Sequence, residues 1–259
     1  MNRLEQIQYL IGVLLKEMPV YQTQAKDFPR DEQSQRRLLR SLMNVRPPAP
    51  VSKEFLRAQD AYLQERLVQR GVTRLQDLTP VRPGLYLWQG DITTLAVDAI
   101  VNAANSGMTG CYIPCHGCID NAIHTYAGIQ LRLECARIMA GQRGEEPVGQ
   151  AKITKAYNLP CRYVLHTVGP MIEGAVTKTD REQLSSCYRS CLDLAAANGL
   201  HSVAFCCIST GEFHFPNELA AQIAIETVRD WQRQNPDKIE VIFNVFKDSD
   251  RELYKRLLG

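Results

Sequence analysis

Short and nearly continuous apolar runs alternate with longer amphipathic segments from about residue 73 onward. A strand can be apolar on both sides only where both faces of its sheet are covered. The run at residues 99–103 shows this most clearly, because it carries no charge. The other predicted strands lie near residues 85–88, 151–157, 163–168, 202–208 and 239–246. Segments with helical periodicity separate or follow them, near residues 120–135, 181–197, 217–231 and 249–258. Asp120 and Asn217 are the expected N-caps of the first and third of these helices. This alternation predicts an α/β domain with a largely buried sheet.

Residues 1–72 carry a different pattern, which predicts helices alone. Apolar residues recur at helical spacing through residues 4–15, and a second helix is expected over residues 31–43. A third helix should begin after Ser52, a suitable N-cap, and end at Gly71, a suitable C-cap. We therefore expect a helical extension packed on the main domain. A partner-docking module is the alternative interpretation of the same helices.

The composition argues against several functional classes. The chain of 259 residues is 45% hydrophobic and 22% charged, with a net charge of +2 and no long basic block. These values are ordinary for a globular protein, and they give no reason to expect a nucleic acid or an anionic membrane as partner. No apolar run approaches the roughly 20 residues that span a bilayer. We expect a cytoplasmic protein.

The cysteines point to a metal rather than to disulfides. Nine is an odd number in a chain of this length, and most of the nine lie in apolar segments. Cys111, His116 and Cys118 form the pattern C-x4-H-x-C, and two thiolates with one imidazole suit tetrahedral zinc. Cys115 is a possible fourth ligand. Four protein ligands would make the site structural, whereas three would leave a position open for water or substrate. Asp120 and Asn121 follow the loop directly, and we expect both to face the same ligand.

Polar residues follow two of the predicted strands. Gly90-Asp91-Ile92-Thr93 comes after the first of them, and the Asp91 carboxylate there could accept a hydrogen bond from an adenine amino group. Taken alone, this tetrapeptide is better explained as a plain turn. Asn102 and Asn105 flank two alanines where the next strand ends. Ligands bind at the carboxyl ends of parallel strands. Capping of the following loop would explain the two amides equally well.

The segment Ser209-Thr210-Gly211-Glu212-Phe213 connects a predicted strand to a predicted helix. Its small residues would let backbone N–H groups approach a diphosphate, and the following helix N-terminus adds a favourable dipole. Phe213 or Phe215 could stack on a ribose or a base. The segment lacks the lysine of a P-loop and the G-x-G-x-x-G of a dinucleotide fold. Alone, it is a weak signal for a phosphate-binding loop.

In their order and spacing, these four motifs resemble those of macrodomains. The cysteine–histidine loop continues into Ile119-Asp120-Asn121-Ala122-Ile123-His124, and it replaces the glycine-rich tract of the common macrodomain pattern. In this replacement the chain resembles the zinc-containing branch of the family, in which a helical region also precedes the domain. The resemblance covers residues 73–259. It implies a three-layer α/β/α sandwich with a mixed central sheet that binds ADP-ribose.

The resemblance also implies roles for individual residues. Asp91 would hold the adenine amino group, and Ile92 would donate its backbone N–H. Asn105 would meet the distal ribose, and Asp120, preceded by the apolar Ile119, matches the aspartate implicated in catalysis in related hydrolases. Asn105 and Asp120 are therefore the expected catalytic residues. The diphosphate and distal ribose would be wrapped by Ser209, Thr210, Gly211, Glu212 and Phe213. Zinc would be held by Cys111, His116 and Cys118.

The activity that the resemblance implies is hydrolysis of the bond between mono-ADP-ribose and a protein side chain. The expected linkage is a glycosidic ester to an acidic residue, made by a sirtuin-type transferase on a substrate such as a lipoyl-carrier protein. Zinc could activate a water, or it could orient the substrate for a water activated by Asp120. Two alternatives remain open. One is a reader that binds ADP-ribose without cleavage and has a structural zinc closed by Cys115. The other is a hydrolase of free ADP-ribose derivatives.

Overall fold

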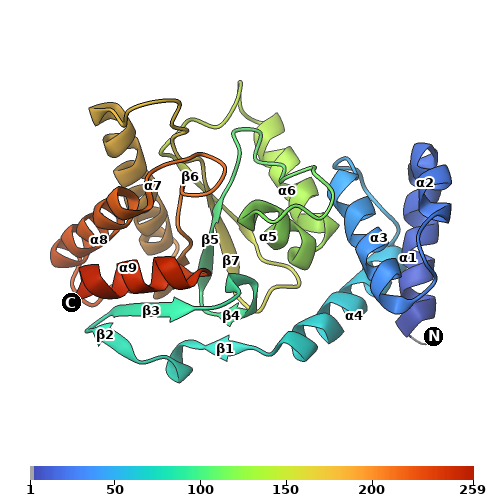
Figure 1. Ribbon diagram of the computed structural model, residues 1–259, viewed down its shortest axis with the longest axis horizontal. Coiled ribbons are helices and arrows are strands. Elements are labelled where there is room, and N and C mark those ends of the chain that lie inside the picture. Colours follow the sequence, from blue (N-terminus) through green and yellow to red (C-terminus); the bar gives the residue numbers. More distant parts are fainter. Residues whose placement is uncertain (1–2) are drawn as a thin grey trace.

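The computed structural model describes residues 3–259, and its centre is a seven-stranded mixed sheet (Figure 1). Its strands are β2 (Pro80–Arg82), β3 (Leu85–Gln89), β5 (Ala99–Ala103), β6 (Ala151–Lys155), β7 (Tyr163–Thr167), β8 (Ser202–Phe205) and β9 (Glu240–Val245). They lie in the order β2-β3-β9-β8-β5-β7-β6. The five central strands run parallel, and the edge strands β2 and β6 pair antiparallel with β3 and β7. A small separate sheet pairs β1 (Thr73–Arg74) with β4 (Leu95–Ala96).

Helices cover both faces of this sheet. The helices α5 (Ile119–Ala127) and α6 (Ile129–Ala140) lie on one side of it, and α7 (Lys178–Ala197), α8 (Asn217–Gln234) and α9 (Asp248–Leu258) pack in succession on the other (Figure 1). Ile100 and Val101 in β5 are fully buried, as a doubly covered strand requires. The predicted three-layer sandwich with a mixed sheet is confirmed.

The first part of the described chain is helical and forms a second core. It contains α1 (Arg3–Glu17), a 3-10 turn at Pro19–Tyr21, α2 (Gln22–Lys26), α3 (Glu32–Val45) and α4 (Lys53–Arg70). Asp31 and Ser52 cap α3 and α4 through their side chains, as the sequence predicted for Ser52. Leu10, Leu39 and Phe55 are buried together, and Ile129 of α6 joins them. Residues 1–2 of the predicted extension lie outside the described residues, and none of the described helices is both long and apolar enough for a membrane span.

Two helix starts differ from the sequence prediction. The helix predicted to begin with Asp120 as its cap is capped by Cys118, whose Sγ accepts from the Asn121 N–H at 3.4 Å. It is also divided in two at Gly128, where φ is +95°. Asn217, the predicted cap of α8, is instead the first residue of that helix, since Pro216 holds the cap position. The short strands β1, β2 and β4 were not predicted, because two or three residues carry no readable periodicity.

The parallel strands bring the motifs to one edge of the sheet. Asp91 follows β3, Asn105 follows β5 and Ser209 follows β8. Since β3, β9, β8 and β5 are parallel neighbours, their carboxyl ends lie on the same side. This edge is the usual location of ligand sites in such sheets.

Candidate functional site

Asp120 lies buried in the first turn of α5, with 4% of its surface exposed. Asn102 Nδ2 donates to its Oδ1 at 2.8 Å, and Asn105 Nδ2 donates to its Oδ2 at 3.1 Å. Burial raises the pKa of this carboxyl to about 6, while the two amide donors and the cationic Arg132 act in the opposite direction. A carboxyl that is held at both oxygens and titrates near neutrality has the properties of a general base.

Two neutral histidines lie behind this carboxyl. Asn102 Nδ2 is 3.1 Å from His166 Nδ1, and the Thr154 hydroxyl is 2.9 Å from His166 Nε2. Burial lowers the pKa of His166 to about 3 and that of His124 well below its usual value. A neutral His166 therefore accepts from Asn102 at Nδ1 and donates from Nε2 to Thr154, a tautomer inferred from this network. His124 Nε2 lies 3.5 Å from Asp120 Oδ1. The sequence had not indicated His166 or Thr154.

The three predicted metal ligands are together. The ligand atoms of Cys111, His116 and Cys118 all lie within 4.8 Å of one another, with 3.6 Å between Cys111 Sγ and His116 Nδ1. Two sulfurs and one imidazole nitrogen form a donor set that suits zinc, so the residues present fit such an ion. Burial raises the pKa of the Cys118 thiol to about 12. An ion bound there would have to displace the thiol proton.

Cys115 points away from this group. Its backbone has a φ of +53°, and its Sγ lies 3.3 Å from Ser41 Oγ in helix α3. The described loop therefore offers three ligands rather than four. His116 has a further neighbour, since its Nε2 is 3.6 Å from the Glu212 carboxylate. A carboxylate on the second nitrogen of a metal-binding imidazole orients the ring, so Glu212 is placed to do this for His116.

Asp91 lies at the far end of the same edge and has a partner that the sequence did not reveal. Its Oδ1 accepts from the Thr93 N–H at 3.0 Å, and its Oδ2 accepts from Arg70 Nη1 at 2.8 Å. Arg70 is the last residue of α4, and its guanidinium also lies 3.6 Å from the centre of the Tyr126 ring. Ile92 follows, with a buried side chain. The helical extension thus contributes a cation at the predicted adenine end.

The loop that follows β8 has an unusual first residue. Ser209 has a φ of +64°, and its buried Oγ has no hydrogen-bond partner among residues 3–259. Such a hydroxyl within a protein needs an explanation, and a polar ligand would provide one. Thr210 is half-buried, whereas Gly211 and Glu212 are exposed. The Phe213 carbonyl accepts from the Ile172 N–H at 2.9 Å, which ties this loop to the loop after β7.

Two residues of the α5 start differ in their orientation. Ile119 is half-buried and packs against the main core. Asn121, which was expected to face the ligand beside Asp120, is fully buried and is turned toward the loop of residues 111–118. Its Nδ2 donates to the Ile113 carbonyl at 2.9 Å, and its Oδ1 accepts from Arg40 of α3 at 2.8 Å. Asn121 therefore supports the loop rather than the ligand site.

Comparison with known proteins assigns the family. The Macro domain family model matches residues 101–224. A Treponema medium protein named protein-ADP-ribose hydrolase is 58% identical over 263 residues, which cover 100% of both chains. The chain belongs to the macrodomain family. This macrodomain is also similar to a protein of Fusarium oxysporum f. sp. cubense that is named as a probable bifunctional ADP-ribose hydrolase/ADP-ribosyltransferase. The two are 41% identical over 86% of this chain and 40% of the relative. In structure it resembles the Trypanosoma brucei macrodomain in complex with ADP-ribose, with a TM-score of 0.66, 33% identity and coverage of 82% and 92% of the two chains.

Proposed function

We propose that this macrodomain binds ADP-ribose along the carboxyl edge of its sheet and hydrolyses the bond between mono-ADP-ribose and a protein side chain. The observation that carries this proposal is the buried Asp120 carboxyl, held at both oxygens by Asn102 and Asn105 and located two residues after Cys118. The 58% identical relative named protein-ADP-ribose hydrolase supports it. The structural likeness to a macrodomain in complex with ADP-ribose supports the ligand.

The ligand would extend from Asp91 to Asp120. The Asp91 carboxylate would accept from the adenine amino group, and the neighbouring Ile92 N–H would donate to the ring. The Ser209 hydroxyl and the backbone of Thr210 and Gly211 would surround the diphosphate at the N-terminal side of α8. Glu212 and Phe213 would lie against the distal ribose, next to Asn105.

The reaction would depend on Asp120 as general base. At neutral pH its carboxylate is ionised, given a pKa of about 6, and it would take a proton from a water directed at the anomeric carbon. Asn105 would hold both this carboxylate and the distal ribose, which fixes their separation. Cys111, His116 and Cys118 would hold a zinc ion, which supplies Lewis-acid polarisation and orientation of substrate oxygens when bound.

The substrate that we propose is a protein modified on aspartate or glutamate by a sirtuin-type transferase, with a lipoyl-carrier protein as one candidate. The Fusarium relative, whose name couples the hydrolase with an ADP-ribosyltransferase, supports this pairing of activities. A reader module would be favoured by a zinc closed with Cys115. The contact of the Cys115 thiol with Ser41 favours the open, three-ligand site instead.

The test is release of ADP-ribose from a mono-ADP-ribosylated protein, with the metal counted in the same sample. Substrates linked through acidic, serine and arginine side chains are compared. We expect release from the acidic linkage, loss of release after chelation and recovery after zinc is restored. Tight ADP-ribose binding without release from any linkage would contradict the hydrolase and indicate a reader. Full activity in a zinc-free Cys118→Ser variant would remove the metal from the chemistry.

A further inference from the structure

The loop that carries the metal ligands is held from outside its own domain. Asn44 of α3 accepts the Cys115 N–H at its Oδ1 with a distance of 2.9 Å. Arg40, one turn earlier on the same helix, donates from Nη2 to the His116 carbonyl at 3.1 Å and to Asn121 Oδ1 at 2.8 Å. Asn121 in turn binds the loop backbone at Ile113. The segment between the first and last ligands is therefore attached to the N-terminal helices at successive residues.

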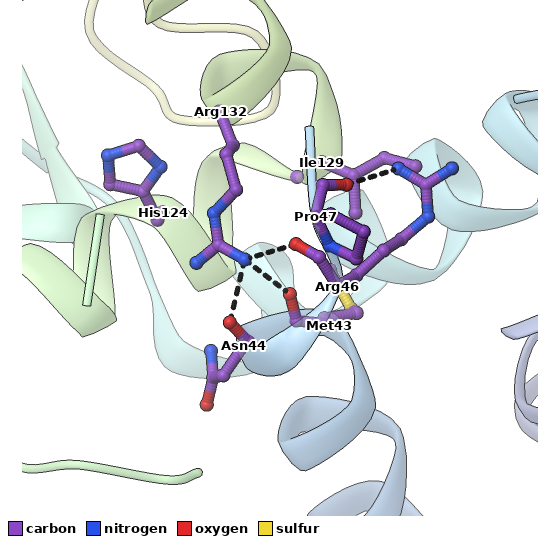
Figure 2. A pocket seen from close by; sticks show the side chains of 8 residues that line it. Met43, Asn44, Arg46, Pro47, His124, Ile129 and Arg132 are labelled. Carbon is purple, nitrogen blue, oxygen red and sulfur yellow. Dashed lines mark hydrogen bonds between the residues drawn. The ribbon is translucent and has the colours of Figure 1, made fainter. Parts of the chain in front are cut away.

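A single arginine joins the beginning of this loop to the end of α3. Arg132 is 4% exposed, and its Nε donates to the Thr109 carbonyl at 2.7 Å while Nη2 reaches the Cys111 carbonyl at 3.3 Å. Its Nη1 donates to the carbonyls of Asn44 and Arg46, each at 2.6 Å (Figure 2). The last carbonyls of a helix have no partner within the helix, and a cation is favourable there. The contact is closely packed, since the cavity beside Arg132 has a volume of only about 10 Å³.

The loop has little structure that would hold the three ligands in place without these contacts. It contains no helix or strand between β5 and α5, and within residues 111–118 the backbone forms one described hydrogen bond, from His116 N to the Ile113 carbonyl. A flexible loop must lose conformational freedom when its side chains converge on an ion. Contacts that order the loop before the ion binds reduce that cost, so their removal should weaken metal binding.

We propose that helix α3 is part of the metal site: Arg40 and Asn44 of α3, with Arg132 of α6 joining the end of α3 to the loop, hold the loop so that Cys111, His116 and Cys118 are arranged for a metal ion before it binds. This inference rests on the proposed zinc site. It assigns the N-terminal extension a positioning role in that site, in addition to its own packing. None of the three positioning residues belongs to the group of ligand atoms, which consists of Cys111, His116 and Cys118.

The experiment measures the zinc dissociation constant of the full-length apoprotein by competition with a chromophoric chelator. Arg40→Ala should bind zinc about 10–100-fold more weakly, the usual effect of removing an outer partner of a metal site. Arg40→Lys should recover part of the affinity, because an ammonium can reach one of the two acceptors. Arg37→Ala is the matched control, since Arg37 lies exposed on the same helix and its backbone carbonyl is retained. It should bind zinc like the wild type.

Two further measurements separate positioning from general damage. The melting temperature of the Arg40→Ala apoprotein and its affinity for ADP-ribose should stay close to the wild-type values. The Arg40 guanidinium donates to His116 and Asn121, and neither is among the residues expected to bind ADP-ribose. Should Arg40→Ala fail to fold, two other variants provide the same comparison: Arg40→Met keeps the aliphatic stem but removes both donors, and Asn44→Ala removes the acceptor of the Cys115 N–H. Wild-type zinc affinity in these variants would overturn the inference and leave the hydrolase proposal intact. A wild-type protein that binds no zinc would overturn both the metal site and the inference.

Discussion

Removal of the Asn102 amide should move the acid limb of the pH–rate profile for ADP-ribose release toward higher pH. Asn102 is fully buried, and its 2.8 Å hydrogen bond lowers the pKa of Asp120, which burial raises to about 6. A hydrogen bond to a charged group contributes about 1.5–3 kcal/mol, and one pKa unit corresponds to about 1.4 kcal/mol. Asn102→Ala should therefore raise the pKa of Asp120 by roughly 1–2 units. At pH 7 the ionised fraction would fall by about two- to tenfold, and the loss would diminish toward pH 9.

The assay is the initial rate of ADP-ribose release from a mono-ADP-ribosylated protein across pH 5 to about 9.5, the range that brackets these values. The control is Asn158→Ala, because Asn158 is also buried but donates to Asp60 and to the Ala127 carbonyl, with no contact to Asp120. Its profile should keep the wild-type shape. An equal fractional loss for Asn102→Ala at every pH, or an unmoved acid limb, would refute the coupling of this amide to the carboxyl.

Three further outcomes are expected. Asp91→Asn should weaken ADP-ribose binding by about tenfold in calorimetry with the zinc content unchanged, and an unaltered affinity would remove Asp91 from the adenine end. Gly169→Ala should weaken the same binding, because an added Cβ would lie 2.0 Å from Ser209 Oγ, whereas Gly174→Ala, with nothing within 4 Å, should be neutral; equal affinities would contradict the placement of the Ser209 loop. His166→Gln should flatten the pH dependence of the free energy of unfolding. Between about pH 6.5 and the folded pKa of about 3, His166 is protonated in the unfolded state and neutral in the native state. As the pH falls through this range, His166 therefore lowers the free energy of unfolding by about 1.4 kcal/mol per pH unit. Urea unfolding of the wild type and the variant at pH 7 and pH 5 measures that difference, and parallel pH dependences would show that His166 is not buried as described.

Much of the sheet and the positions of the site motifs could be predicted from the sequence. The residues of β5 form an uncharged run that only a covered strand explains, and Asp91, Asn105 and Ser209 each follow such a run. The division between α5 and α6 was missed, although Gly128 inside a helical pattern is a known sign of a break. The reason for the break lies far away in the chain: Gln59 of α4 accepts the Ile129 N–H at 3.0 Å.

The supports of the site could not be predicted in the same way. The loop of residues 111–118 is contacted by Arg40, Asn44 and Arg132 across sequence separations that no local pattern encodes. The exclusion of Cys115 from the triad depends on its positive φ and on Ser41, and both are tertiary facts. The spacing of the cysteines alone favoured an open site but left Cys115 as a possible fourth ligand. Only the packing of α3 against the loop of residues 111–118 distinguishes them.

The most direct test of the account compares the wild type with Asp120→Ala for ADP-ribose affinity and for ADP-ribose release in the same zinc-loaded samples. In the proposed reaction Asp120 would activate water, and it would contribute little to the adenine or diphosphate contacts. We predict that Asp120→Ala binds ADP-ribose within a few-fold of the wild type and releases it from the modified protein at least about 100-fold more slowly. Release at the wild-type rate, with binding intact, would show that the reaction does not depend on this carboxylate and would contradict the central claim.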